Sequence, residues 1–254
     1  MRQSVLELRD FYASPLGGAA QRMVARKVTE AWDGVSGLDL LGLGYASPFL
    51  QLIDAGARRS LAAMPPAQGV EAWPVRGANR ACLGEEAALP FPNAFFDRIL
   101  VVHALEESDN PSALLAEATR VLSPSGRIIL VVAARRGLWA HVESSPFGHG
   151  RSFSRAQLER LVGEADLTPL SWTRALYAPP LRWASRWADA FEQSGAWLWP
   201  SFSGLIMLEA SKQTLALRPR GLAARVPARR PVFAPAPVSG KAQGPVPVAR
   251  VGER

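Results

Sequence analysis

The sequence predicts an α/β fold with a mostly parallel sheet that is covered by helices on both faces. Segments with strand character alternate with segments of helical periodicity between about residues 37 and 210. The strongest strand segments, 97–102 and 127–133, are apolar on both faces, as expected for strands buried between two layers of helices. The 254 residues suffice for one sizeable domain with extensions.

Hydrophobic periodicity predicts the elements in this order: helices over 5–12 and 18–32, a strand over 37–43, a helix over 48–55, strands over 59–64, 81–83 and 97–102, a helix over 111–122, a strand over 127–133, a helix over 154–164 and a strand over 205–210. Ser47 is a candidate N-cap with Pro48 in the first turn, and Asn110 or Asp109 is a candidate N-cap for the next helix. Ser123 to Gly126 is expected to form a turn.

Aromatic residues concentrate near the end of this region. Five of the eight tryptophans lie between Trp172 and Phe202, and Trp183, Trp187 and Phe191 recur every four residues. This spacing favours a helix with one apolar side facing the core. An apolar substrate pocket and an interfacial membrane face are the alternatives.

The positive charge of the chain is concentrated in residues 218–254. The whole chain has a formal net charge of +7 and a pI of about 10.4. The segment 218–254 holds eight basic residues and one acidic residue, a balance of +7, so residues 1–217 are formally neutral. Its Pro, Ala, Arg and Gly content, with few large apolar side chains, predicts a disordered tail. Contact of the tail with nucleic acid or an anionic membrane is an alternative that the neutral remainder does not support.

Composition also limits the location and the metal chemistry. Cys82 is the only cysteine, which excludes an internal disulfide and a cysteine-cluster metal site. The three histidines are far apart in the sequence, so we expect no metal site. No apolar run approaches the roughly 20 residues of a membrane span, and the first residues lack the apolar stretch of a signal peptide. We therefore expect a cytoplasmic protein.

The stretch LDLLGLGYASP, residues 38–48, indicates a strand that enters a glycine turn and then a helix. Gly42 and Gly44 allow a tight turn and a close approach of a ligand to the backbone. The following helix N-terminus offers free N–H groups and positive potential. A dinucleotide fingerprint would have a third glycine at Ser47. Taken alone, the loop fits either a cofactor site or a structural turn.

Two downstream motifs favour the cofactor site. The run LPFPN (89–93) leads through FD (96–97) into a strand, and the next helix ends in RVLSPSG (120–126) before another strand. In this order the motifs closely resemble class I S-adenosylmethionine-dependent methyltransferases that act on small molecules, of the type 11-like group. The resemblance covers about residues 36–134. It implies a Rossmann-like fold and S-adenosylmethionine as the cofactor.

The resemblance implies specific cofactor-binding positions: Gly42, Leu43, Gly44, Tyr45, Ala46, Met64, Glu85, Glu86 and His103. Glu85 stands where the family accepts a hydrogen bond from the adenine amino group. Two acidic positions of the family are degenerate, because Leu40 precedes the first glycine by two residues and Met64 ends the second strand. Asp39 is no substitute for the first, since neighbouring strand residues point to opposite faces. Each missing charge-assisted hydrogen bond loses about 1.5–3 kcal/mol.

Two histidines are candidate catalytic residues. His103 follows the fourth strand on the cofactor side, and His149 lies on a glycine-flanked loop. Either side chain could assist deprotonation of a methyl acceptor. The alternatives are a structural role for His103 and a backbone hydrogen bond for His149.

The sequence therefore predicts methyl transfer from S-adenosylmethionine to a small-molecule acceptor. Three parts are expected: an N-terminal helical extension (1–35), an α/β domain (36–217) and the basic tail (218–254). Leu40 and Met64 motivate an alternative, a methyltransferase fold that serves as a non-catalytic binding or regulatory module. A weaker alternative is nucleic-acid or anionic-surface binding through the tail.

Overall fold

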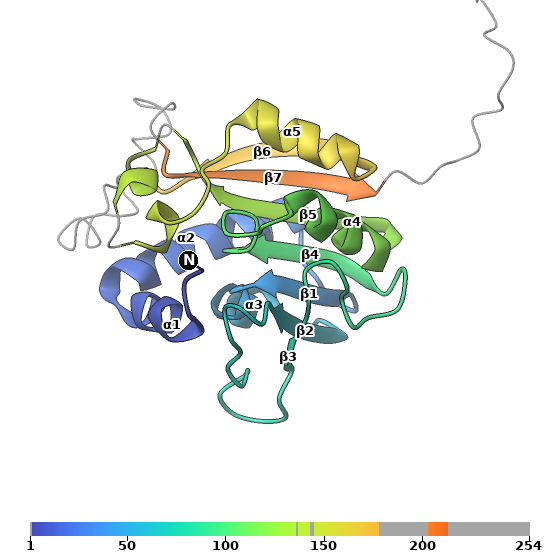
Figure 1. The fold of residues 1–254 in the computed structure, drawn as a ribbon. Helices are drawn as coiled ribbons and strands as arrows, with labels where there is room; N and C mark the ends of the chain where they lie inside the picture. The colour runs from blue at the N-terminus through green and yellow to red at the C-terminus, as the bar shows by residue number, and fades with distance from the viewer. Residues whose placement is uncertain (1, 136, 143–144, 178–202, 213–254) are drawn as a thin grey trace, which may run out of the picture. The chain divides into compact units, whose positions relative to one another are not determined.

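A seven-stranded sheet forms the centre of the protein (Figure 1). In the computed structural model, residues 2–135, 137–142, 145–177 and 203–212 are described. The strands are β1 (Asp39–Gly44), β2 (Arg59–Met64), β3 (Ala81–Leu83), β4 (Phe96–Val102), β5 (Leu122–Ala133), β6 (Leu167–Ala175) and β7 (Leu205–Lys212). Their order is β3-β2-β1-β4-β5-β7-β6, with β7 antiparallel to both neighbours and the other pairs parallel. The predicted α/β fold with a mostly parallel sheet is confirmed.

Helices cover both faces of the sheet. The first layer contains α1 (Val5–Ala13), α2 (Pro15–Trp32) and α3 (Ser47–Ile53), and the second contains α4 (Pro111–Val121) and α5 (Arg155–Glu164). Because neighbouring strand residues point to opposite faces, Leu40 joins the first core and Leu41 the second. Two short 3-10 helices, η1 (Leu138–His141) and η2 (Pro146–Gly148), lie between β5 and α5.

The first residues of the helices can be compared with the predicted N-caps. Asn110 is confirmed as the N-cap of α4, since its side chain accepts a hydrogen bond from the Ala113 N–H at 3.1 Å. Ser47 as the N-cap of α3 is wrong. The helix already includes Ser47, and the capping position is Ala46, which has helical dihedrals and no side-chain hydrogen bond. Helix α2 begins earlier than expected, because Ser14 caps it by accepting from the Gly17 N–H at 3.1 Å.

Two features of the sheet differ from the prediction. Strand β6 was not expected, and the turn predicted over Ser123 to Gly126 is part of β5. The pairing steps from Phe96 opposite Leu122 to Arg98 opposite Arg127, so residues 123–126 form an excursion opposite Asp97. The predicted tail and the helix proposed for Trp183, Trp187 and Phe191 lie outside the described residues, and the three-part division of the chain stays a prediction. Among the described residues, no helix has the length and apolar character needed to cross a membrane.

Candidate functional site

The glycines of the first loop are required by the packing of the chain itself. Gly44 has φ +77°, and a Cβ there would lie 2.3 Å from the Val102 carbonyl oxygen. A Cβ at Gly42 would lie 2.7 Å from the Ala46 Cβ and 2.8 Å from the Leu50 Cδ1. These contacts hold β1 close to β4 and α3 with or without a ligand. The glycines therefore fit a cofactor loop without demonstrating one.

A small cavity lies at the carboxyl ends of the parallel strands, where ligands of such sheets bind. Its lining includes three predicted cofactor residues and three neighbours from the loops that follow β2, β3 and β4: Leu43, Gly44, Glu86, Pro65, Gly84 and Ala104. The cavity volume is about 10 Å³. That is room for about one water molecule, whereas ligand pockets typically measure about 300–1,000 Å³.

The other predicted cofactor residues do not line this cavity. Tyr45 is buried, and its hydroxyl donates to Glu71 Oε1 at 2.7 Å. Ala46 and Met64 are fully buried in the core of the first helix layer. Glu85 is exposed next to Glu86 and forms a backbone bridge with Ala88. Three of the predicted residues therefore line the cavity at the carboxyl edge of the sheet, and the structure places the others elsewhere; their binding roles stay predictions.

Arg2 binds two residues that line the cavity. Its guanidinium forms an ion pair with Glu86 and donates to the Ala104 carbonyl oxygen at 3.0 Å. The other carboxylate oxygen of Glu86 accepts from the Ser108 hydroxyl at 2.6 Å. A residue that the resemblance assigns to the cofactor is therefore bound by the chain's own N-terminus.

Backbone contacts hold the same N-terminal segment along this edge. The Gln3 N–H donates to both carboxylate oxygens of Glu107 at 3.1 Å, and the Val5 N–H donates to the Gln68 carbonyl at 2.8 Å. Residues 2–5 thus run between the loop after β4 and the loop after β2, and Figure 1 shows the N-terminus at the carboxyl ends of β1 and β4. No local pattern in residues 2–5 predicts these long-range contacts.

The two degenerate acidic positions are apolar and inaccessible. Leu40 and Met64 each have 0% exposure. Asp39 lies at the opposite end of β1, where its carboxylate accepts from Arg58 Nε at 2.9 Å and Nη2 at 2.6 Å. The Arg58 hydrogen bonds hold the pKa of Asp39 below its usual range. Asp39 thus anchors the amino end of β1 and does not replace the missing acid.

His103 is part of an aromatic cluster that joins α1 to the end of β4. Its Nε2 lies 2.6 Å from the Tyr12 hydroxyl, and its ring centroid lies 4.6 Å from that of Phe147. Burial lowers the pKa of His103 to about 3, so the ring is neutral near pH 7, and its tautomer sets whether Nε2 or the Tyr12 hydroxyl donates. A side chain with this pKa is a weak proton acceptor at neutral pH. The catalytic role of His103 stays a prediction.

Glu106 is a candidate that the sequence reasoning missed. The side chain is buried, and Oε1 accepts from the Ala133 N–H at 3.3 Å. Oε2 is buried without a hydrogen-bond partner among the described residues. Burial raises the pKa of Glu106 to about 7, which suits proton exchange near neutral pH. Its place three residues beyond His103, just past β4, was the available signal.

His149 lies in a different environment from His103. It is partly exposed after η2, near the Glu7 and Glu107 carboxyl groups. Burial raises the pKa of Glu107, and the His149 charge opposes that rise. The structure thus places His149 beside acidic groups of α1 and the loop after β4. Its catalytic role also stays a prediction. No cluster of metal-binding side chains occurs within the described ranges.

The sequence is similar to a known family and to several curated proteins. Residues 41–130 match the family model described as a methyltransferase domain. The ubiquinone/menaquinone biosynthesis C-methyltransferase UbiE of Ralstonia nicotianae is 31% identical over 64 residues, which are 25% of this chain and 26% of that protein. The UbiE of Bordetella parapertussis is 40% identical over 47 residues, 18% of each chain. The matched segments thus span about a quarter or less of these relatives.

Solved structures share the fold at low sequence identity. A chain in the complex of the Haloferax volcanii Trm112 methyltransferase activator with a methyltransferase has a TM-score of 0.55, 18% identity, and coverage of 80% of this chain and 90% of that one. The geranyl diphosphate C-methyltransferase of Streptomyces coelicolor, solved with Mg²⁺, geranyl diphosphate and S-adenosyl-L-homocysteine, has a TM-score of 0.52, 15% identity, and coverage of 74% and 76%. The [4+2]-cyclase SpnF has a TM-score of 0.51, 18% identity, and coverage of 76% and 80%.

Proposed function

We propose that this chain, whose residues 41–130 match the family model of a methyltransferase domain, transfers the methyl group of S-adenosylmethionine to a small molecule. One observation carries the proposal. The segment that matches the family model contains the glycine loop and Glu86, and these lie together at the carboxyl edge of the sheet. The similarity to UbiE covers too little of either chain to carry the quinone-biosynthesis acceptor over. The acceptor class therefore stays open.

The residue types at this edge fit the cofactor, but the cavity between them is too small to hold it. Leu43, Gly44 and Glu86 line the cavity, whereas Glu85, the adenine position that the resemblance implies, is exposed outside it. A cavity of about 10 Å³ does not accommodate the cofactor. The proposal therefore requires the Arg2 segment to withdraw from Glu86.

Proton transfer in this proposal falls to a buried side chain beside the site. The cofactor supplies an activated methyl group, and the protein mainly positions the acceptor. Glu106, with a pKa of about 7, is the side chain best matched to take a proton from the acceptor. His103 and His149 are the alternatives from the sequence. The Tyr12 hydroxyl holds His103 in place and occupies its Nε2 atom.

Titration calorimetry with S-adenosylmethionine and S-adenosylhomocysteine tests the proposal. We expect saturable binding of both, and a rise in melting temperature, because a ligand at 100 times its dissociation constant stabilises the folded state by about 2.7 kcal/mol. Glu86→Gln should weaken binding, whereas Glu164→Gln on the exposed side of α5 should leave it unchanged. Absence of heat and of a thermal shift at millimolar ligand would contradict the proposal.

The burial of Leu40 and Met64 favours a second candidate, a non-catalytic binding module with the same fold. The two candidates differ in what happens when the N-terminal segment is loosened. A methyltransferase should bind S-adenosylhomocysteine at least as well after Arg2→Ala. A module that has lost its cofactor site should not bind S-adenosylhomocysteine, either as the unaltered chain or as Arg2→Ala.

A further inference from the structure

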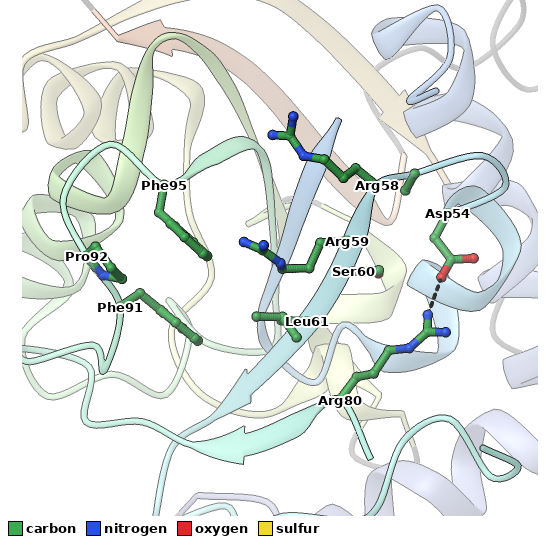
Figure 2. Close-up of a pocket in the computed structure, with 10 residues that line it drawn as sticks. Asp54, Arg58, Arg59, Ser60, Leu61, Arg80, Phe91, Pro92 and Phe95 are labelled. Atoms are coloured by element: carbon green, nitrogen blue, oxygen red, sulfur yellow. Dashed lines mark ion pairs between the residues drawn. The ribbon is translucent and has the colours of Figure 1, made fainter. Parts of the chain in front are cut away.

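A larger pocket lies at the opposite edge of the sheet, around the amino end of β2 (Figure 2). Its volume is about 530 Å³, within the usual range for small-molecule sites. β2 runs from Arg59 in this pocket to Met64 at the cofactor edge. At about 3.3 Å per residue, the two ends are roughly 17 Å apart. The pocket is therefore separate from the proposed methyl-transfer site.

Positive charge predominates in the pocket lining, which contains three arginines and one carboxylate. Arg58 is held bidentately by Asp39 behind the pocket. Arg59 makes no side-chain hydrogen bond among the described residues, and its closest carboxylate oxygen is Asp39 Oδ2 at 3.8 Å. Arg80 is 3.6 Å from Asp54 Oδ2, also beyond a short hydrogen bond. Arg59 and Arg80 thus keep N–H donors for an anion.

An aromatic wall stands beside these donors. Figure 2 shows Arg59 extending from β2 toward Phe95 and Phe91. The Arg59 Cζ lies 4.6 Å from the Phe95 ring centroid. Both phenylalanine rings meet the buried Phe96 edge-to-face at centroid distances of 5.0 Å, which fixes their orientation. The pocket therefore combines two rigidly held aromatic rings with a guanidinium that lies over one of them.

We propose that this pocket binds a small aromatic oxyanion, a phosphate or carboxylate carried on a flat ring. The oxyanion accepts from Arg59 and Arg80, and the ring packs on Phe91 and Phe95. An isolated inorganic anion would contact only the arginines, and a neutral ring would contact only the phenylalanines. Binding should therefore require both groups on one molecule.

Calorimetry on the full chain at low salt tests this proposal with phenyl phosphate, benzoate, inorganic phosphate and phenol. We expect saturable binding of phenyl phosphate or benzoate at low millimolar concentration, weaker binding of phosphate and none of phenol. The stronger of the two aromatic anions identifies the headgroup. Binding should weaken as salt rises, because the pocket is open to solvent.

Three variants locate the binding. Arg59→Gln should weaken phenyl phosphate binding about tenfold or more, the effect of losing a charge-assisted hydrogen bond. Phe95→Leu should weaken phenyl phosphate but not inorganic phosphate. Arg155→Gln is the matched control, since Arg155 also lies over an aromatic ring, that of Trp172, at 4.9 Å.

The proposal is overturned if neither aromatic anion binds, or if Arg59→Gln and Arg80→Gln both bind as well as the unaltered chain. Circular dichroism of each variant shows whether it is folded, and Arg80→Gln replaces Arg59→Gln if the latter is not. None of these outcomes depends on S-adenosylmethionine binding, so failure here is distinct from failure of the proposed function.

Discussion

Glu106 and His103 lie three residues apart after β4, and burial shifts their pKa values in opposite directions. Glu106 has a pKa of about 7 in the folded state against 4.5 for an ordinary glutamate, so it stays protonated when the unfolded chain has lost that proton. Its contribution to stability is complete below about pH 4.5 and is lost as the pH rises toward 7. His103, with a pKa of about 3 against 6.5, contributes above about pH 6.5, and that contribution is lost as the pH falls toward 3.

Glu106→Gln should remove the first of these effects. Between pH 5 and pH 8, the free energy of unfolding of the unaltered chain should fall by about 2–3 kcal/mol more than that of the variant. Urea unfolding at several pH values measures this difference. Glu164→Gln, on the exposed surface of α5, should follow the unaltered chain. Parallel pH profiles for Glu106→Gln and the unaltered chain would mean that Glu106 is ionised when folded.

Tyr12→Phe should destabilise the protein by about 1–3 kcal/mol, because the buried His103 Nε2 loses its hydrogen-bond partner. Tyr45→Phe is a close comparison in the same aromatic cluster. Its hydroxyl partner Glu71 is partly exposed and can be rehydrated, so the cost should be smaller. Denaturant midpoints of the two variants test the difference. Equal losses of stability in the two variants would show that burial of the hydrogen-bond partner does not set the size of the loss.

At the scale of elements, the N-terminal segment contacts the candidate cofactor site, and we expect that it limits access to the site. Arg2→Ala removes the ion pair with Glu86 and the hydrogen bond to the Ala104 carbonyl. If these contacts are worth about 1.5 kcal/mol or more, the variant should bind S-adenosylhomocysteine about tenfold more tightly. Arg9→Ala, which alters an exposed ion pair with Asp10, is the control. Weaker binding by Arg2→Ala would mean that Arg2 supports the bound state.

Most elements could be predicted because their signals are local. The apolar runs of β1, β4 and β5 and the Asn110 cap are legible in the sequence. Strand β6 could not be predicted from periodicity, because most of its residues are exposed or half-buried and Pro169 interrupts it. It forms through antiparallel pairing with β7, a partner about 40 residues later in the chain.

The site could be predicted only in part, for a related reason. The glycine loop follows a strand with a clear apolar pattern, so its place at the carboxyl edge of the sheet could be predicted, whereas its binding role stays a prediction. The hydrogen bonds that occupy Glu86 and His103 come from Arg2 and Tyr12. These pairs are 84 and 91 residues apart in the sequence. A single sequence contains no pattern that reports such pairs. The positive φ of His103 and the unpaired Glu106 oxygen also arise only after folding.

At the scale of the whole molecule, charge separates the chain into two parts. Residues 218–254 carry +7 and residues 1–217 carry no net charge. Deleting 218–254 should abolish salt-sensitive binding to heparin, while S-adenosylhomocysteine binding and the melting temperature stay unchanged. Heparin chromatography and calorimetry on the truncated chain provide the test. Retention of heparin binding after truncation would show that a local basic surface, such as the arginine pocket at β2, suffices.

The apolar side chains at Leu40 and Met64 also bear on turnover. S-adenosylmethionine carries one positive charge that S-adenosylhomocysteine lacks, and nearby carboxylates favour the charged molecule. Leucine and methionine are buried at both positions, so among the residues that line the cavity Glu86 is the only carboxylate that favours substrate over product. Arg2 offsets that charge while the ion pair is intact, so product should compete more strongly in that state than in one from which Arg2 has withdrawn.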